Sequence, residues 1–190
     1  LAANQNHPHA QFILGIIYSN NKFIKQDINK SIYYLTLAAN QNHPYAQLLL
    51  GSFYNEKKCM MNGINKAVHY ELAAKQNNPE AQYNISKIYY EGKYVLRDIK
   101  KAIYYLFLSA NGNYSEAQYS LGFLYYEGKH VTRDINKSIY YFTLASKQNH
   151  KKSQSMLGYI YLDAKYITRD LDKSIYYYSL AANQNDISAQ

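Results

Sequence analysis

Histidine, cysteine and carboxylate side chains could support metal or acid–base chemistry, but their spacing in this sequence predicts neither. The six histidines are His7, His9, His43, His69, His130 and His150. No two of them have the i, i+4 spacing of a helical metal pair, and no other type of metal ligand clusters with them. No Ser-His-Asp set follows from the spacing, and the Gly-x-x-x-x-Gly-Lys phosphate loop is absent. We therefore expect no catalytic residue, no metal and no cofactor.

A glycine column shows that the sequence repeats itself about every 36 residues. The column comprises Gly15, Gly51, Gly122 and Gly158, with Ser86 in the remaining slot. The spacing shortens to 35 once, because one residue is absent near Glu71. Ala-Gln pairs recur with the same period. A period in this range marks a repeat array whose units contact only their neighbours, which directs attention to surfaces rather than pockets.

Each repeat is predicted to contain two helices. The first starts near Pro8, Pro44, Pro79, Ser115 and Lys151. Proline suits the first helical turn, because its missing N–H would have no partner there. The column glycine falls in the middle of this helix, where glycine costs roughly 1 kcal/mol relative to alanine. Its recurrence indicates that another helix approaches closely at this point.

The second helix of a repeat is predicted to start at an aspartate, which caps unpaired backbone N–H groups. These aspartates are Asp27, Asp98, Asp134 and Asp170. Gly63 takes this place in the second repeat, so we expect that helix start to fray. The helices are predicted to end at asparagines, which tolerate the left-handed conformation. These asparagines are Asn6, Asn42, Asn77, Asn113, Asn149 and Asn185.

The recurring pattern resembles the Sel-one-like repeat (SLR), a relative of the tetratricopeptide repeat. The fourth repeat carries it as Ala117, Leu121, Gly122, Tyr125, Gly128, Val131, Asp134, Lys137, Ser138 and Tyr141. An aromatic position often filled by tryptophan in the family holds Tyr34, Tyr70, Tyr105, Tyr141 and Tyr177 here. The resemblance implies an all-α fold, a right-handed α-solenoid of stacked helix-turn-helix repeats, that serves as an interaction scaffold or adaptor.

The whole chain is interpreted as a single repeat array, residues 1–190. Its five full units lie at about 8–42, 44–77, 79–113, 115–149 and 151–185, with half-units at both ends. Because the first six residues match residues 37–42, we expect a fragment of a longer chain. The apolar ends of a truncated array are expected to fray or to self-associate end to end, since terminal repeats normally carry a polar cap.

Along one face of the first helix, the residue type at a line of positions differs from repeat to repeat. Because the repeat pattern does not fix these residues, we expect them to contact a partner. From this line we select a candidate groove: Phe12, Ile16, Leu48, Tyr83, Lys87, Tyr90, Tyr119, Phe123, Tyr126 and Tyr159. In related solenoids the first helices line the concave surface. Exposed tyrosine is common at interfaces, so this line predicts binding of a peptide or helix from a protein partner. The alternative is that these aromatic residues pack between helices.

The net charge of +8 raises a second functional hypothesis. A lysine column follows the aspartates: Lys30, Lys66, Lys101, Lys137 and Lys173. Such a stripe could follow a phosphate backbone, as in a helical-repeat RNA-binding module. Because the lysine is part of the repeat pattern, a structural role is the preferred interpretation, and protein is favoured over nucleic acid as the partner. A third alternative is a structural spacer, or a regulatory module attached to an enzyme domain such as a kinase.

The sequence predicts a cytoplasmic location. No segment approaches the roughly 18 apolar residues that a membrane span requires. The first residues lack the basic start and apolar run of a signal peptide. Cys59 is the single cysteine, which excludes an internal disulfide framework and favours a reducing compartment.

Overall fold

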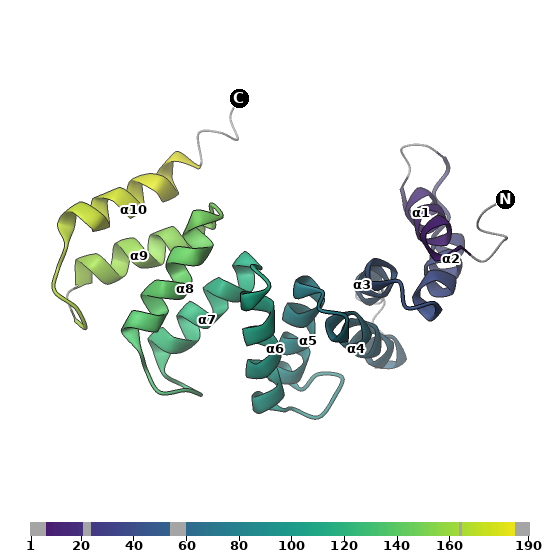
Figure 1. Cartoon of the computed structure of the whole chain (residues 1–190), viewed down its shortest axis with the longest axis horizontal. Helices are drawn as coiled ribbons and strands as arrows, with labels where there is room; N and C mark the ends of the chain where they lie inside the picture. The colour runs from purple at the N-terminus through teal and green to yellow at the C-terminus, as the bar shows by residue number, and fades with distance from the viewer. Residues whose placement is uncertain (1–6, 21–23, 54–59, 164, 185–190) are drawn as a thin grey trace. The chain divides into compact units, whose positions relative to one another are not determined.

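The computed structural model describes residues 7–20, 24–53, 60–163 and 165–184. These residues form ten α-helices and include no β-strand (Figure 1), which confirms the all-α fold. The helices are α1 (Pro8–Ser19), α2 (Ile28–Asn40), α3 (Pro44–Phe53), α4 (Met60–Lys75), α5 (Pro79–Glu91), α6 (Ile99–Asn111), α7 (Ser115–Glu127), α8 (Ile135–Lys147), α9 (Lys151–Asp163) and α10 (Leu171–Asn183).

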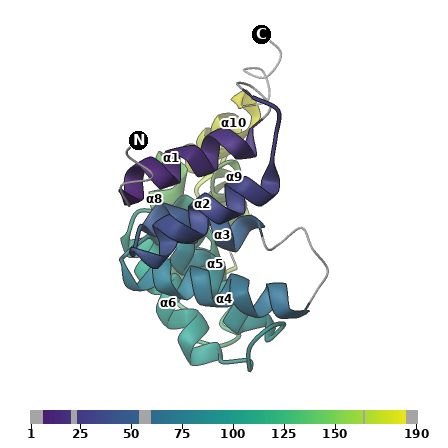
Figure 2. The same cartoon turned by 90° about the vertical axis from the view of Figure 1, so that its right-hand side faces the viewer.

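The helices belong to two compact units, Leu1–Tyr105 and Leu106–Gln190, whose boundary falls within α6. In the first unit α1 packs on α2, α2 on α3, α3 on α4 and α4 on α5. In the second unit α7 packs on α8, α8 on α9 and α9 on α10. The pair α9 and α10 lies side by side in Figure 1, and the pair α1 and α2 in Figure 2. Packing between consecutive helices is the pattern of a repeat protein.

The column glycines allow the two helices of a repeat to approach closely, as their recurrence predicted. A Cβ atom added to Gly122 would lie 2.6 Å from the Phe142 ring, and one added to Gly15 would lie 2.6 Å from the Leu35 side chain. These distances are too short for carbon atoms in contact, so a side chain would force the helices apart. The same relationship joins Gly51 to Tyr70 and Gly158 to Tyr178.

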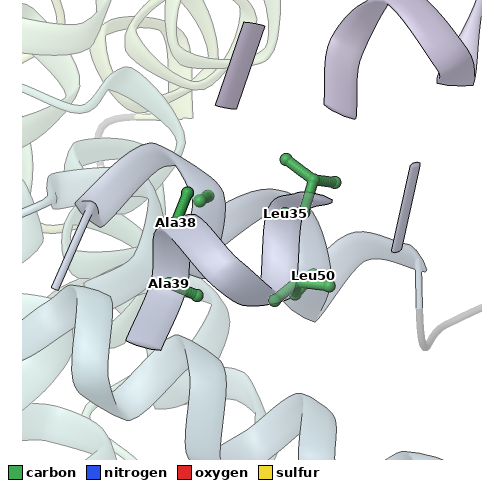
Figure 3. Close-up of a cluster of buried hydrophobic side chains, with 5 residues drawn as sticks. Leu35, Ala38, Ala39 and Leu50 are labelled. Atoms are coloured by element: carbon green, nitrogen blue, oxygen red, sulfur yellow. The ribbon is translucent and has the colours of Figure 1, made fainter. Parts of the chain in front are cut away.

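A small apolar core joins one repeat to the next. Between α2 and α3 it contains Leu35, Ala38 and Ala39 from α2 and Leu50 from α3 (Figure 3), all of them buried. Full burial of a leucine side chain contributes about 1.5–3 kcal/mol. The alanines contribute little area, but their small size lets the helices approach. The interface between α2 and α3 therefore combines large and small side chains.

An asparagine in the left-handed conformation connects one repeat to the next. Asn42 has a φ of 62°, and its N–H donates to the Ala39 carbonyl at 2.9 Å. The N–H of His43 donates to the Ala38 carbonyl at 3.1 Å, which completes a Schellman motif. Asn77, Asn113 and Asn149 adopt the same conformation, with φ of 61°, 63° and 60°. The predicted role of asparagine is confirmed at these four positions, whereas Asn6 and Asn185 lie outside the described residues.

The aspartates cap the second helices as predicted. The Oδ1 atoms of Asp27, Asp98, Asp134 and Asp170 accept backbone N–H groups three residues later at 2.9–3.0 Å. The expectation for Gly63 is wrong, because α4 begins at Met60 and Gly63 lies within the helix. Glycine has no side chain to accept the capping hydrogen bond, so nothing marks that position as a helix start.

The assignment of Tyr70 to the tryptophan-like column is also wrong. In the other repeats this column stacks on the tyrosine of the first helix; for example, the rings of Tyr18 and Tyr34 lie 5.7 Å apart at 5°. Tyr70 instead packs against Gly51, in the place that Leu35 occupies in the first repeat. The one-residue deletion therefore precedes Tyr70 and rotates the later part of α4 by one position.

Candidate functional site

An aromatic surface in the second unit contains four of the predicted groove residues. Tyr119, Phe123 and Tyr126 lie on α7 and Tyr159 lies on α9, and Tyr166, just after α9, joins them. The rings of Tyr119 and Phe123 stack at 6.3 Å. The ring of Tyr126 makes edge contacts with Tyr159 at 6.5 Å and with Tyr166 at 6.1 Å. These five residues are called the aromatic surface below.

The aromatic surface has an anchored part and an exposed part. Tyr119 packs at 5.7 Å from the buried Phe142 ring and at 4.9 Å from the His150 ring. Phe123 and Tyr159 are 36% and 42% exposed. The packing interpretation therefore describes Tyr119, whereas Phe123 and Tyr159 are available to a partner.

The hydroxyl of Tyr126 is held in its neutral form. Burial, followed by a hydrogen bond with Tyr159, raises the pKa of Tyr126 to about 12. Nearby, the Arg133 guanidinium lies 5.1 Å from the centre of the Tyr166 ring. The Lys165 ammonium lies 5.2 Å from the same ring centre, so two cations flank the aromatic surface at Tyr166.

The predicted groove residues of α1 and α3 differ in their accessibility. Phe12 stacks on His43 at 4.5 Å and packs against the core between α2 and α3. Ile16 is 37% exposed. Leu48 is buried, with 8% of its surface exposed, so it does not belong to an accessible surface.

On α5, the predicted groove residues carry positive charge beside their aromatic rings. The Lys87 ammonium lies 5.6 Å from the centre of the Tyr83 ring, and the Arg97 guanidinium lies 5.7 Å from that of Tyr90. Tyr90 is 41% exposed. Cations thus lie against aromatic rings on α5 as they do at Tyr166 in the second unit.

The lysine column takes part in contacts within the repeat. The ammonium groups of Lys30, Lys101, Lys137 and Lys173 lie 5.1–5.3 Å from the ring centres of Tyr18, Tyr89, Tyr125 and Tyr161. Three of these lysines also form ion pairs with the aspartates that cap their own helices, at 2.8–3.6 Å. Intramolecular contacts thus account for the recurrence of lysine without any nucleic acid.

A ladder of glutamines that joins the repeats went unrecognised in the sequence, although the Ala-Gln pairs were visible there. Gln47 is buried, and its Nε2 donates to the Ala39 carbonyl of the preceding helix at 3.1 Å. Its Oε1 accepts from Gln76, at the end of its own repeat, at 2.7 Å. The equivalent pairs are Gln11–Gln41, Gln118–Gln148 and Gln154–Gln184.

A set of arginines that cap the C-terminal ends of the first helices was also not recognised from the sequence. The Nε atoms of Arg97, Arg133 and Arg169 donate to the carbonyls of Tyr90, Tyr126 and Leu162 at 3.0–3.1 Å. A signal was present in the sequence, because each arginine directly precedes a capping aspartate. These arginines satisfy carbonyls that would otherwise lack partners at the helix ends.

Three histidines that share one position of the repeat act at helix starts. The Nδ1 atoms of His7, His43 and His150 accept the backbone N–H three residues later, at 3.4, 3.3 and 3.2 Å. Burial is the main cause that lowers the pKa of His43 and of His150. Among the described residues, no group of three or more His, Cys, Asp or Glu side chains could hold a metal ion.

None of the described helices combines the length and the apolar character that crossing a membrane would require.

Paired helices, glycines at the close contacts between them and helix caps all recur with the same period in this chain. Together they define a helical repeat protein. The pattern of the Sel1 repeat family matches residues 8–43, 79–114, 115–150 and 151–186. The chain belongs to this family. The part between the first two matches contains the departures at Gly63 and Tyr70. Sel1 repeat proteins are generally protein-interaction scaffolds, typically without enzymatic activity.

Solved structures show the same fold. A Sel1 repeat protein from Oxalobacter formigenes is 30% identical, with a TM-score of 0.84 over 96% of this chain and 53% of that one. The protective antigen c5321 of uropathogenic Escherichia coli, which has an SLR fold, is 26% identical, with a TM-score of 0.88 over 96% and 39%. Cysteine-rich protein B of Helicobacter pylori is 23% identical, with a TM-score of 0.56 over 73% and 100%. The chain thus spans about half or less of the first two proteins. No match was found among curated proteins.

Proposed function

We propose that this chain is a scaffold that binds a peptide or helix of a protein partner through the aromatic surface of its second unit. The observation that supports the proposal is the exposure of Phe123 and Tyr159 beside the anchored Tyr119 and Tyr126. An anchored ring keeps its position while a neighbouring ring remains open to a ligand. Such rigid aromatic contacts bind with little loss of side-chain entropy.

The rim of the aromatic surface fits the same role. Leu162, on α9, is 42% exposed, and the Arg133 guanidinium lies against Tyr166. Interfaces commonly combine an aromatic centre with arginine and a polar rim. A partner segment with apolar side chains along one face would cover Phe123 and Tyr159, and its polar face would meet the rim. A cytoplasmic location for this interaction stays a prediction.

The test is partner capture by the purified chain from a lysate of its own cells, with and without nuclease. The variant Phe123→Ser/Tyr159→Ser removes the exposed rings and leaves Tyr119 in the core. The matched control is Tyr140→Ser/Tyr176→Ser, because both tyrosines are 58% exposed but lie on α8 and α10. We expect protein partners that survive nuclease, that are lost with the first variant and that are retained with the control.

Two other results would contradict the proposal. If both variants capture the partners equally well, the aromatic surface does not bind them. That result would favour a structural spacer. Capture that disappears with nuclease would instead favour an RNA-binding module. Circular dichroism of each variant separates loss of binding from loss of fold.

A further inference from the structure

A hollow of about 260 Å³ lies between α4 and α5 in the first unit. Lys66 and Tyr70 line it from α4, Lys87 and Glu91 from α5, and Lys93 from the segment after α5. Among the residues that the structure describes, its lining carries three ammonium groups and one carboxylate, a net charge of +2 (3 − 1). It is called the lysine hollow below. The excess of positive charge in a concave site favours an anionic ligand.

Lys66 differs from the other members of the lysine column in the residue that precedes it by three positions. Its counterparts follow a capping aspartate by three residues, whereas Lys66 follows Gly63, which has no carboxylate. The Lys66 ammonium lies 5.8 Å from the centre of the Tyr70 ring, and Tyr70 also lines the hollow. The Lys66 ammonium therefore shares the lining of the hollow with two further lysines.

The three ammonium groups are close enough to disfavour one another. Burial, followed by the charges of Lys87 and Lys93, lowers the pKa of Lys66, and Glu91 opposes this effect. A bound anion would relieve the repulsion between the lysines. Glu91 supplies part of that relief and would compete with a ligand of the same charge.

We propose that the lysine hollow binds a dianionic phosphate monoester. A phosphate monoester carries a charge of about −1.5 to −2 at pH 7, and its three oxygens can accept hydrogen bonds from several lysines. A single carboxylate would neutralise only about half of the net charge of the lining. The hollow has the volume of several water molecules, each about 30 Å³ in the liquid, which leaves room for a hydrated phosphate group. The site lies in the first unit and does not depend on the aromatic surface.

The probe is inorganic phosphate, titrated into the isotopically labelled full chain at neutral pH and low ionic strength. Backbone amide shifts in α4 and α5 report binding, and chloride at equal ionic strength controls for screening. We expect saturable shifts confined to these helices. Lys66→Gln and Lys87→Gln should each weaken binding at least tenfold. Lys100→Gln removes the same charge from an exposed position of α6 outside the lining and should leave the Kd unchanged.

Glu91→Gln gives the sharpest test, because it should tighten phosphate binding severalfold, a gain that misfolding cannot produce. Shifts that rise linearly without saturation would overturn the proposal, as would equal weakening by Lys100→Gln and Lys66→Gln. An unchanged Kd in Glu91→Gln would overturn it as well.

Two further probes distinguish the sources of the phosphate monoester. O-phosphoserine and a short phosphoserine peptide should both compete with inorganic phosphate at the lysine hollow. Tighter binding of the peptide than of the free amino acid would identify a phosphorylated protein partner. Equal binding of the two would identify a small phosphorylated molecule, and failure of both to compete would contradict the proposal.

Discussion

The Lys173 ammonium lies 5.1 Å from the centre of the Tyr161 ring, so a lysine at the start of one helix rests on an aromatic residue of the helix before it. The same ammonium forms an ion pair with Asp170, at 2.8 Å. The Tyr161 ring in turn stacks on Tyr177 at 5.9 Å. Lysine, aspartate and two tyrosines that are separated in the sequence therefore contact one another, and we call them a contact set. Residues of the same types recur at the same spacing in other repeats.

This contact set predicts that the column lysines stabilise the fold. Lys137→Gln should lower the free energy of unfolding by about 0.5–1 kcal/mol, the range for an exposed cation–π contact. The Lys137 ammonium lies 5.3 Å from the centre of the Tyr125 ring. A double-mutant cycle with Tyr125→Leu, measured by urea unfolding, should give a coupling energy of similar size. Lys129→Gln, at an exposed loop position, is the control and should have little effect.

The column glycine provides a test in which two principles disagree in sign. Helix propensity alone would make Gly122→Ala stabilising by about 1 kcal/mol. The added methyl group would lie 2.6 Å from the Phe142 ring, and overpacking of this kind costs about 1–3 kcal/mol. We expect a net loss of stability in urea unfolding. The double variant Gly122→Ala/Phe142→Leu should recover part of the loss, and a stabilised single variant would show that the helices can separate at no cost.

The sequence predicted the caps and the close helix contacts because each depends on a few residues at fixed spacing. Asp134 could be recognised as an N-cap from the apolar run that follows it, and Gly122 as a contact point from its recurrence. The α4 start and the placement of Tyr70 were wrong for different physical reasons. Gly63 has no side chain that could mark a helix start. A deletion within a helix rotates every later residue by about 100°, and the sequence does not show where the deletion falls.

The candidate site was less predictable than the fold. Periodic aromatic residues could be found in the sequence, but burial depends on how neighbouring helices pack. Leu48 and Phe123 were both assigned to the predicted groove, yet Leu48 is buried and Phe123 is exposed. The lysine hollow could not be predicted either, because it combines residues from α4 and α5 whose convergence depends on how the two helices pack.

The glutamine ladder predicts a high cost for losing one buried amide. Gln118 donates to the Ala110 carbonyl at 3.2 Å and accepts from Gln148 at 2.8 Å. Gln118→Leu should lower the free energy of unfolding by roughly 1–3 kcal/mol, because the amide's hydrogen bonds to the Ala110 carbonyl, to Asn113 Oδ1 and from Gln148 would all be lost. The Ala110 carbonyl itself keeps the N–H of Asn113 as a donor, at 3.1 Å. Chemical unfolding followed by circular dichroism measures the loss. The double variant Gln118→Leu/Gln148→Leu should cost less than the sum of the single variants, and strict additivity would contradict a direct link between the two amides.

The histidine caps predict that stability decreases in mildly acidic solution. His150 Nδ1 accepts the Ser153 N–H, so the ring must be unprotonated at that nitrogen. Burial, opposed by Glu116 and supported by Lys152, lowers the pKa of His150, and burial together with His9 lowers that of His43. The unfolded chain then binds more protons than the folded one in the window just below about pH 6.5, so stability falls as the pH decreases through it. Thermal melting between pH 8 and 5 should show this slope.

The chain itself supplies the matched substitution. Asn78 occupies the same position in the third repeat, and its Oδ1 accepts the Ala81 N–H at 2.9 Å without any titratable group. His43→Asn/His150→Asn should therefore keep both caps and show a smaller loss of stability between pH 6.5 and 5, while the stability at pH 8 decreases because the ring contacts with Phe12 and Tyr119 are lost. The carboxylates of Asp134 and Asp170 do not interfere, because their pKa values are lowered from 3.8 and they titrate below this window. An unchanged slope in the asparagine variant would show that other groups carry the acid sensitivity.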